Sequence, residues 1–259
     1  MNDLNLQLLG RITVTGKIVL VSGLHIGAGK DTIEIGGLDN PVIKHPHTGQ
    51  PYIPGSSLKG RLRFLLEWAF DTVRDDGKPW GADGQDRNAQ TDPRDPVLRI
   101  FGTPIKAEAW KGGPTRLMVR DAMLEREWLD DALARNLPLT EEKTEVVIDR
   151  IAGKAHDRIG PRQTERVPAG ARFDLELVFR VYDTGDGGRQ DQACFNWLLA
   201  GLSLLEQDAL GGSGSRGYGR IRFDDLVCRH SNGVEARLDN RFRVAAFDPQ
   251  EAPDIFTWN

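Results

Sequence analysis

Cysteine is almost absent from this sequence, and long apolar runs are absent altogether. The 259 residues include only Cys194 and Cys228, which are too few for a disulfide framework or a structural zinc site. No apolar run approaches the length of a membrane-spanning helix. The residues after Met1 also lack the basic and then apolar order of a signal peptide. We therefore expect a protein of the reducing cytoplasm that has no membrane partner.

An excess of positive charge is missing too. Lys and Arg number 34, Asp and Glu number 38, and the net charge is −4. A free-standing nucleic-acid-binding protein is more often basic, so a nucleic-acid site must be local or be completed by neighbouring subunits. Glycine, in contrast, is abundant, with 29 residues clustered where the backbone would have to approach another group closely.

The predicted elements follow the order strand, helix, strand, arm, strand, helix, strand. Alternating residues predict strands at 11–21, 116–122, 173–181 and 220–223, and apolar periodicity predicts helices at 57–73, 125–136 and 192–210. This order predicts an α+β sheet with helices on one face, of the ferredoxin-like kind. We expect one domain over residues 1–259, with a flexible insertion at 71–96, a projecting arm at 140–166 and a C-terminal extension at 232–259.

Residues 53–63 lead from a tight turn into a helix whose first turns carry cations. Pro54 and Gly55 predict the turn. Ser56 or Ser57 could cap the helix that follows. The cations are Lys59, Arg61 and Arg63. Cations oppose the helix dipole at this end, so helix stability does not explain them, whereas a bound phosphate would. A solvated basic helix face is the alternative.

A second cluster, at residues 211–220, combines five glycines with two arginines. It precedes a strand and does not open a helix, so it is neither a nucleotide-hydrolase phosphate loop nor a dinucleotide fingerprint. Exposed N–H groups together with Arg216 and Arg220 would suit phosphates, and Tyr218 could stack on a base. A plain glycine turn is the alternative, although such a turn needs only one or two glycines.

Four separated motifs resemble the RAMP superfamily of CRISPR proteins, and most closely the repeated backbone subunit of the type III-A effector, the Csm complex. The motifs are Gly-Leu-His-Ile-Gly (23–27), Gly-Leu-Asp-Asn-Pro-Val-Ile-Lys (37–44), Pro-Tyr-Ile-Pro-Gly-Ser-Ser-Leu-Lys-Gly-Arg-Leu-Arg (51–63) and Gly-Gly-Ser-Gly-Ser-Arg-Gly-Tyr-Gly-Arg (211–220). The similarity covers residues 11–223 in order, and the insertion and the tail look like additions.

The resemblance implies a subunit that forms a filament along a CRISPR guide RNA, with copies of itself and other type III effector subunits. It implies a fold like a modified RNA-recognition motif, with the arm as a thumb that kinks the guide. It also implies cutting of complementary target RNA at regular intervals with a divalent metal, Mg²⁺ or Mn²⁺. The residues that it assigns to RNA binding are His25, Lys59, Arg61, Arg63, Arg150, Arg162, Gln163, Arg166, Gly212, Ser213, Gly214, Ser215, Arg216, Gly217 and Tyr218.

The resemblance places the cut, and the metal, on Asp39. A carboxylate on a glycine loop can bind Mg²⁺ and help to position a ribose 2′-hydroxyl, with RNA phosphate oxygens as further ligands. From the residues alone, an Asx-turn before Pro41 is the simpler interpretation. Asp121 and Glu145 are further polar candidates that we leave outside the catalytic set.

Two other functions remain open at this point. A non-cleaving guide-RNA scaffold would not need Asp39. A free-standing guide-processing ribonuclease would cut repeat RNA as an isolated protein without added metal.

Overall fold

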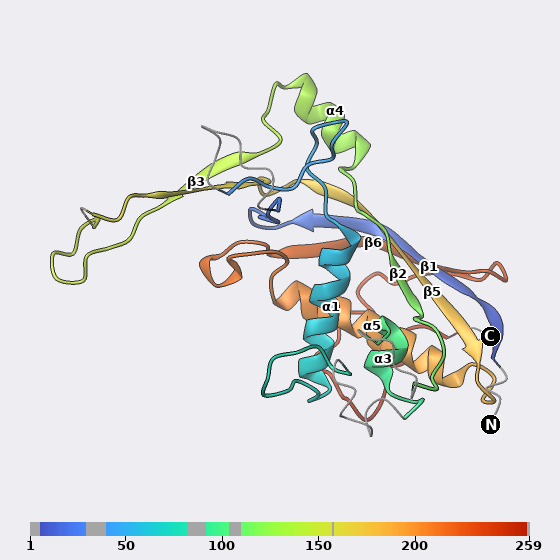
Figure 1. Cartoon of the computed structure of the whole chain (residues 1–259). Coiled ribbons are helices and arrows are strands. Elements are labelled where there is room, and N and C mark those ends of the chain that lie inside the picture. Colours follow the sequence, from blue (N-terminus) through green and yellow to red (C-terminus); the bar gives the residue numbers. More distant parts are fainter. Residues whose placement is uncertain (1–5, 30–39, 82–91, 104–109, 157, 258–259) are drawn as a thin grey trace.

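A five-stranded antiparallel sheet forms the centre of the described part of the chain (Figure 1). The computed structural model describes residues 6–29, 40–81, 92–103, 110–156 and 158–257. The strand order is β2-β5-β1-β6-β7, and each neighbouring pair is antiparallel. The strands are β1 (Gln7–Leu20), β2 (Leu117–Val119), β5 (Arg172–Asp183), β6 (Ile221–His230) and β7 (Glu235–Arg237). The central strand, β1, pairs with β5 on one side and β6 on the other.

The helices α1 (Gly55–Ala69), α3 (Pro96–Phe101) and α5 (Arg189–Gln207) lie on one face of this sheet (Figure 1). The apolar side chains of α5 recur every three or four residues, so they form one stripe that packs against the sheet. This stripe is fully buried and consists of Phe195, Leu198, Leu199, Leu202 and Leu205. The helix α4 (Arg126–Ala134) lies apart from these three helices (Figure 1). The predicted α+β class is confirmed.

A separate two-stranded sheet projects from the body of the protein (Figure 1). It pairs β3 (Glu141–Glu145) with β4 (Arg162–Arg166), and the chain between them runs out to a distant turn. This hairpin, residues 141–166, occupies the segment for which the sequence predicts an arm, and we call it the arm below.

The ends of the predicted insertion and the C-terminal extension both contact the helices. Trp80 donates a hydrogen bond from Nε1 to Asp95 at 2.7 Å, so the described ends of the insertion at 71–96 meet near α3. In the extension, the side-chain amide of Asn196 on α5 exchanges two hydrogen bonds with the backbone of Phe256, at 3.0 and 3.2 Å. No helix among the described residues is long and apolar enough to span a membrane.

Candidate nucleic-acid interface

Two glycine-rich segments that are distant in the sequence lie side by side. The N–H group of Gly212 donates to the carbonyl oxygen of His25, and that of Gly219 donates to the carbonyl oxygen of Gly23, both at 2.9 Å. Gly211 has a φ of +78°, and a Cβ atom there would lie 2.4 Å from the His25 carbonyl oxygen. Glycine is therefore required here for two backbones to touch. The close packing joins the motifs at 23–27 and 211–220 into one surface.

This surface presents unpaired cations. The side chains of Arg216 and Arg220 are exposed and form no ion pair within the described residues. Arg216 ends a short 3₁₀ turn, Gly214–Arg216, which holds the loop in a defined shape. Of the other predicted loop residues, Gly212, Ser215 and Gly217 are exposed, and Ser213 and Gly214 are half-buried. Exposed backbone and free guanidinium groups suit a phosphate chain.

Tyr218 does not have the predicted base-stacking geometry. Its side chain is only 1% exposed. The Nζ atom of Lys143 lies 4.3 Å from the ring centroid, and the guanidinium carbon of Arg166 lies 5.2 Å from it. Both cations belong to the arm, so the ring is already covered. The prediction that Tyr218 binds RNA is corrected: the ring packs the arm against the glycine loop, and burial, followed by the negative charge of Glu145, raises the pKa of its hydroxyl.

The arm carries the remaining predicted basic residues in two different settings. Arg150, Arg162 and Gln163 are exposed along it. Arg166, at its base, forms an ion pair with Glu141 at 2.7 Å, and its side chain lies over Gly23. Arg166 thus attaches the arm to the glycine surface, while the outer residues remain available to a ligand.

Glu165 connects β4 to the segment that follows Asp39. Asp39 itself lies outside the described residues, and the chain is described again from Asn40. The N–H group of Glu165 donates to the Asn40 carbonyl oxygen at 3.1 Å. Its carboxylate accepts from the Val42 N–H at 2.9 Å and from Lys44 Nζ at 2.6 Å. Burial alone would raise the pKa of Glu165, but these hydrogen bonds outweigh it and hold the pKa below its usual value.

His25 joins the same group of segments. Its Nδ1 atom lies 2.7 Å from the carbonyl oxygen of Glu165, and its half-buried ring lies beside Gly27 and Gly212. The structure therefore brings together His25, the glycine loop, the base of the arm and the chain that leads away from Asp39.

The N-terminus of α1 is capped differently from the prediction. Neither serine caps it; instead, Asp121 accepts a hydrogen bond from the Gly55 N–H at 2.7 Å. A Cβ atom on Gly55 would lie 2.4 Å from the carbonyl oxygen of Val119, which explains the glycine. A carboxylate at this position competes with phosphate for the helix N-terminus.

Arg63 has a structural role instead of the predicted RNA contact. It forms an ion pair with Glu67 at 2.6 Å and donates to the carbonyl oxygens of Trp80 at 2.7 Å and Gly102 at 3.1 Å. Its side chain is 15% exposed. These partners occupy the guanidinium, so Arg63 attaches the segments at Trp80 and Gly102 to α1 and is not available to a guide.

Lys59 and Arg61 are also engaged, although less completely. Lys59 donates from Nζ to the carbonyl oxygen of Leu117 at 3.1 Å, and burial, followed by the charge of Arg63, lowers its pKa. Arg61 pairs with Asp208 at 2.7 Å and is 28% exposed. An exposed pair of this kind contributes little stability, so an RNA phosphate could replace Asp208 as the partner of Arg61.

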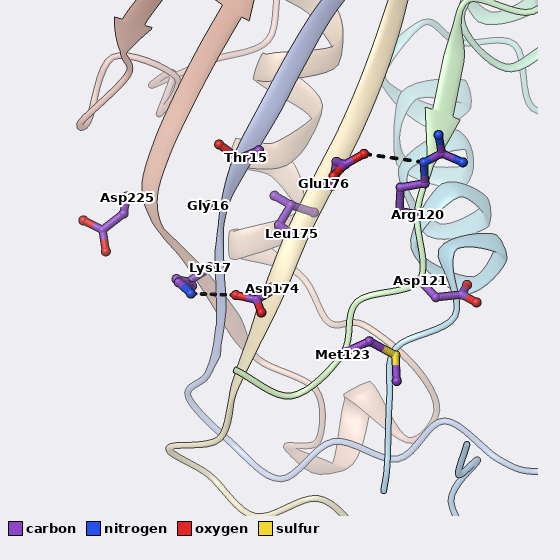
Figure 2. A pocket seen from close by; sticks show the side chains of 10 residues that line it. All are labelled: Thr15, Gly16, Lys17, Arg120, Asp121, Met123, Asp174, Leu175, Glu176 and Asp225. Carbon is purple, nitrogen blue, oxygen red and sulfur yellow. Dashed lines mark hydrogen bonds and ion pairs between the residues drawn. The ribbon is translucent and has the colours of Figure 1, made fainter. Parts of the chain in front are cut away.

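The open face of the sheet is poorly suited to RNA. It holds a cavity of about 530 Å³ (Figure 2). The cavity is lined by Thr15, Gly16, Lys17, Arg120, Asp121, Met123, Asp174, Leu175, Glu176 and Asp225. The four carboxylates outnumber the two cations and would repel phosphates. None of these residues is aromatic, whereas an RNA-recognition motif stacks bases on aromatic side chains of its sheet.

A complete metal site is not formed by the described residues alone. They contain no group of three or more His, Cys, Asp or Glu side chains that could hold a metal ion. The donor set therefore fits a divalent cation only if Asp39 and the oxygens of a bound RNA supply the ligands.

The fold and the site define a class of protein. An α+β domain that presents a basic glycine loop and a cationic hairpin is typical of proteins that follow an extended nucleic-acid backbone. Within that class, the chain belongs to the RAMP superfamily, whose family model matches residues 17–222.

Curated relatives and solved structures narrow the comparison. The chain is 41% identical to the CRISPR system Cms endoribonuclease Csm3 of Methanocaldococcus jannaschii over 240 residues, which cover 92% of this chain and 89% of that protein. It is 39% identical to the Csm3 endoribonuclease of Methanothermobacter thermautotrophicus, with coverage of 83% and 84%. A crystal structure of a Csm3–Csm4 subcomplex from a type III-A interference complex matches with a TM-score of 0.55 and 28% identity, over 92% of this chain and 95% of that one.

Sequence reasoning missed Glu165 as a site residue, whereas Arg220 was named as a phosphate partner and Asp121 as a polar candidate. Arg220 was visible in the glycine motif, and its exposure in the structure adds it to the cationic surface. Glu165 lies in the predicted arm, but the sequence does not show that it contacts Val42 and Lys44.

Proposed function

We propose that this chain is the backbone endoribonuclease subunit of a type III-A Csm effector complex. It binds a CRISPR guide RNA and cuts complementary target RNA at regular intervals. The observation that carries this proposal is the convergence of four segments: the loop at 23–27, the chain after Asp39, the base of the arm and the glycine loop at 211–219. The similarity of this chain to Csm3 endoribonucleases over most of its length supports the same function.

The guide RNA follows the glycine surface and the arm. Arg216 and Arg220 pair with its phosphates, and the outer arm residues Arg150 and Arg162 extend the contact. His25, held by Glu165, positions the RNA and does not cut it. Phosphate contacts fix the register of the guide and carry no sequence information, which suits a subunit that must accept any guide.

The cut depends on Asp39. This carboxylate, together with RNA phosphate oxygens, holds a divalent cation, Mg²⁺ or Mn²⁺. When bound, the cation supplies Lewis-acid polarisation of the scissile phosphate. The hydrogen bonds that Glu165 donates to the Asn40 carbonyl oxygen and accepts from the Val42 N–H hold the segment that follows Asp39 beside the guide-binding surface.

The core is a ferredoxin-like domain modified from an RNA-recognition motif. The order β2-β5-β1-β6, with helices after β1 and β5, supports this assignment. The arm at 140–166 is the thumb that kinks the guide. Residues 1–259 form one domain, with the insertion at 71–96 and the extension at 232–259 as additions to it.

Copies of the chain line up along one guide and join other type III subunits. The crystallised relative that forms a subcomplex with Csm4 supports this type of partner. The net charge of −4 favours the same conclusion, since a single acidic subunit binds RNA weakly and several copies on one strand bind through multivalency.

Removing divalent metal is expected to stop target cutting by the assembled complex without releasing the guide. Chelation removes the cation but leaves the phosphate contacts in place. The measurement is cleavage of a labelled complementary RNA with EDTA, and then with Mg²⁺ or Mn²⁺ restored. No cutting under any metal would favour a pure scaffold. Cutting of repeat RNA by the isolated chain in EDTA would favour a free-standing guide-processing ribonuclease.

Changing Arg216 and Arg220 together to alanine is expected to weaken guide binding equally for guides of any sequence. The slope of log affinity against log salt should fall by about 1.4, because each contact to single-stranded phosphate contributes roughly 0.7. The matched control changes Arg222 and Arg229, which are exposed on β6 and paired with Asp224 and Glu235. Equal losses of guide affinity in the two double variants would contradict the assignment of Arg216 and Arg220 to the RNA-binding surface.

A further inference from the structure

The ring of Tyr218 is contacted by two cations, one from each strand of the arm. The Nζ atom of Lys143, on β3, lies 4.3 Å from the ring centroid. The guanidinium carbon of Arg166, at the end of β4, lies 5.2 Å from the same centroid. Both distances fall within the range of a cation–π interaction. Because Tyr218 itself belongs to the glycine loop, its ring connects that loop to both strands of the arm.

The ring of Tyr218, and not its hydroxyl group, makes these contacts. The hydroxyl oxygen is buried and has no hydrogen-bond partner of ordinary geometry among the described residues. A buried hydroxyl without a partner costs free energy and does not hold two segments together. The face of an aromatic ring, in contrast, attracts a cation, which an aliphatic side chain of similar size does not. The contact therefore depends on an aromatic ring.

The backbone around Tyr218 belongs to the guide-binding surface. The exposed Arg216 and Arg220 lie two residues before and two residues after it. Gly219 fixes this part of the loop, because its N–H donates to the carbonyl oxygen of Gly23 at 2.9 Å. The position of the ring is thus tied to the position of the two arginines that are free to pair with phosphates.

The other side of the contact leads to the segment that follows Asp39. Arg166 directly follows Glu165, whose N–H donates to the carbonyl oxygen of Asn40 at 3.1 Å. Asn40 also forms a parallel β-bridge with Thr164, the next residue back along β4. A shift of β4 relative to the glycine loop would therefore carry this segment with it.

The arm needs an attachment of this kind. It is only two strands wide and projects from the body of the protein (Figure 1). An isolated two-stranded hairpin has little stability of its own, so contacts at its base must fix its direction.

We propose that Tyr218 is a positioning residue for target cutting. Its ring holds the arm in one orientation to the glycine loop. This orientation sets the distance between the guide phosphates on Arg216 and Arg220 and the segment that begins after Asp39. The inference rests on the proposed function, because it concerns the cut assigned to Asp39, and it requires no contact between Tyr218 and RNA.

Two substitutions, tested in the complex assembled on guide RNA, separate the ring from its hydroxyl group. Tyr218→Leu removes the ring and should slow single-turnover target cutting by about 10- to 100-fold, because a small misplacement of a reacting group is costly in rate. Tyr218→Phe keeps the ring and should cut within about threefold of the unchanged protein. Guide affinity should change by less than about threefold in both variants, because the phosphate contacts are intact.

A double-mutant cycle tests the contact between Tyr218 and Lys143. Lys143→Met removes the cation and keeps an apolar stem. It should slow cutting in the unchanged protein by about threefold or more. It should add little to Tyr218→Leu, because that variant has already lost the contact. The control is Arg158→Met, on the exposed outer arm, which should have the same small effect in both backgrounds.

The outcomes distinguish this inference from its alternatives. Normal cutting by Tyr218→Leu, or additive effects of Tyr218→Leu and Lys143→Met, would overturn it. An equal loss in Tyr218→Phe would assign the effect to the hydroxyl, and a parallel loss of guide affinity would assign the residue to RNA binding. Lys143 is 33% exposed, so its variant tests the contact even if Tyr218→Leu does not assemble. If the unchanged complex cuts with metal and all variants cut equally, only this inference fails; if it does not cut, the proposed function fails first.

Discussion

Replacing Asp39 with alanine is expected to reduce target-RNA cutting by the assembled complex by about 100-fold or more. A cation that polarises the scissile phosphate is worth several kcal/mol, and each 1.4 kcal/mol is a factor of ten in rate. Guide binding should persist or tighten slightly, because the change removes a negative charge from a phosphate-binding surface. The measurement is single-turnover cleavage of a labelled target, together with the mass of the assembled complex.

The matched control for this prediction is Asp75→Ala. Asp75 is a loop carboxylate that is exposed and forms no ion pair within the described residues. Its removal should leave cutting unchanged. Normal cutting by Asp39→Ala in complexes of normal mass would place the catalytic group elsewhere. Loss of assembly in both variants would indicate a folding effect, and Asp39→Asn, which preserves shape, would then separate charge from packing.

The main sheet and its helices could be predicted because their signals are local. Alternation over 173–181 marks one buried face of β5, and the apolar periodicity of 192–210 marks the stripe on α5. The strand predicted at 116–122 is shorter in the structure, where only Leu117–Val119 pairs with β5 in a continuous register. Strand ends depend on neighbours, which the sequence does not display.

The sequence identified the basic residues near the candidate site, but it did not show which of them are occupied by other protein groups. Arg63 and Arg216 both appear in glycine-containing basic motifs, and the sequence gives no reason to treat them differently. In the structure, Glu67 and two carbonyl groups occupy Arg63, whereas Arg216 is exposed. Tyr218 was misassigned for the same reason, since the arm that covers it is distant in the sequence.

Long-range contacts explain why the roles of Glu165 and Asp121 were not predicted. Glu165 acts through segments at 40–44, and Asp121 caps α1 from another loop. Neither contact has a local signature, so neither could be derived from spacing. Asp39 lies outside the described residues, so both its position and its chemistry stay predictions that rest on its motif.

A buried charge cluster outside the site determines the second large effect. Asp191, at the start of α5, is fully buried and accepts hydrogen bonds from Arg99 at 2.9 Å and Arg116 at 3.0 Å. It also accepts from the Tyr182 N–H at 2.8 Å. The two arginines are 1% and 0% exposed. Asp191 therefore ties α3, the segment before β2 and the end of β5 to the start of α5.

Changing Asp191 to alanine is expected to lower the free energy of unfolding by about 3–5 kcal/mol, because it leaves two guanidinium groups buried without their counter-ion. For a chain of this size the Tm should fall by roughly 6–20 °C. The measurement is thermal and urea unfolding followed by circular dichroism. The control is Asp130→Ala, which removes a carboxylate from an exposed pair with Arg126 and should cost about 0–1 kcal/mol. Equal effects of the two changes would mean that the cluster is compensated by water or relaxation, and that Asp191 does not hold these elements together.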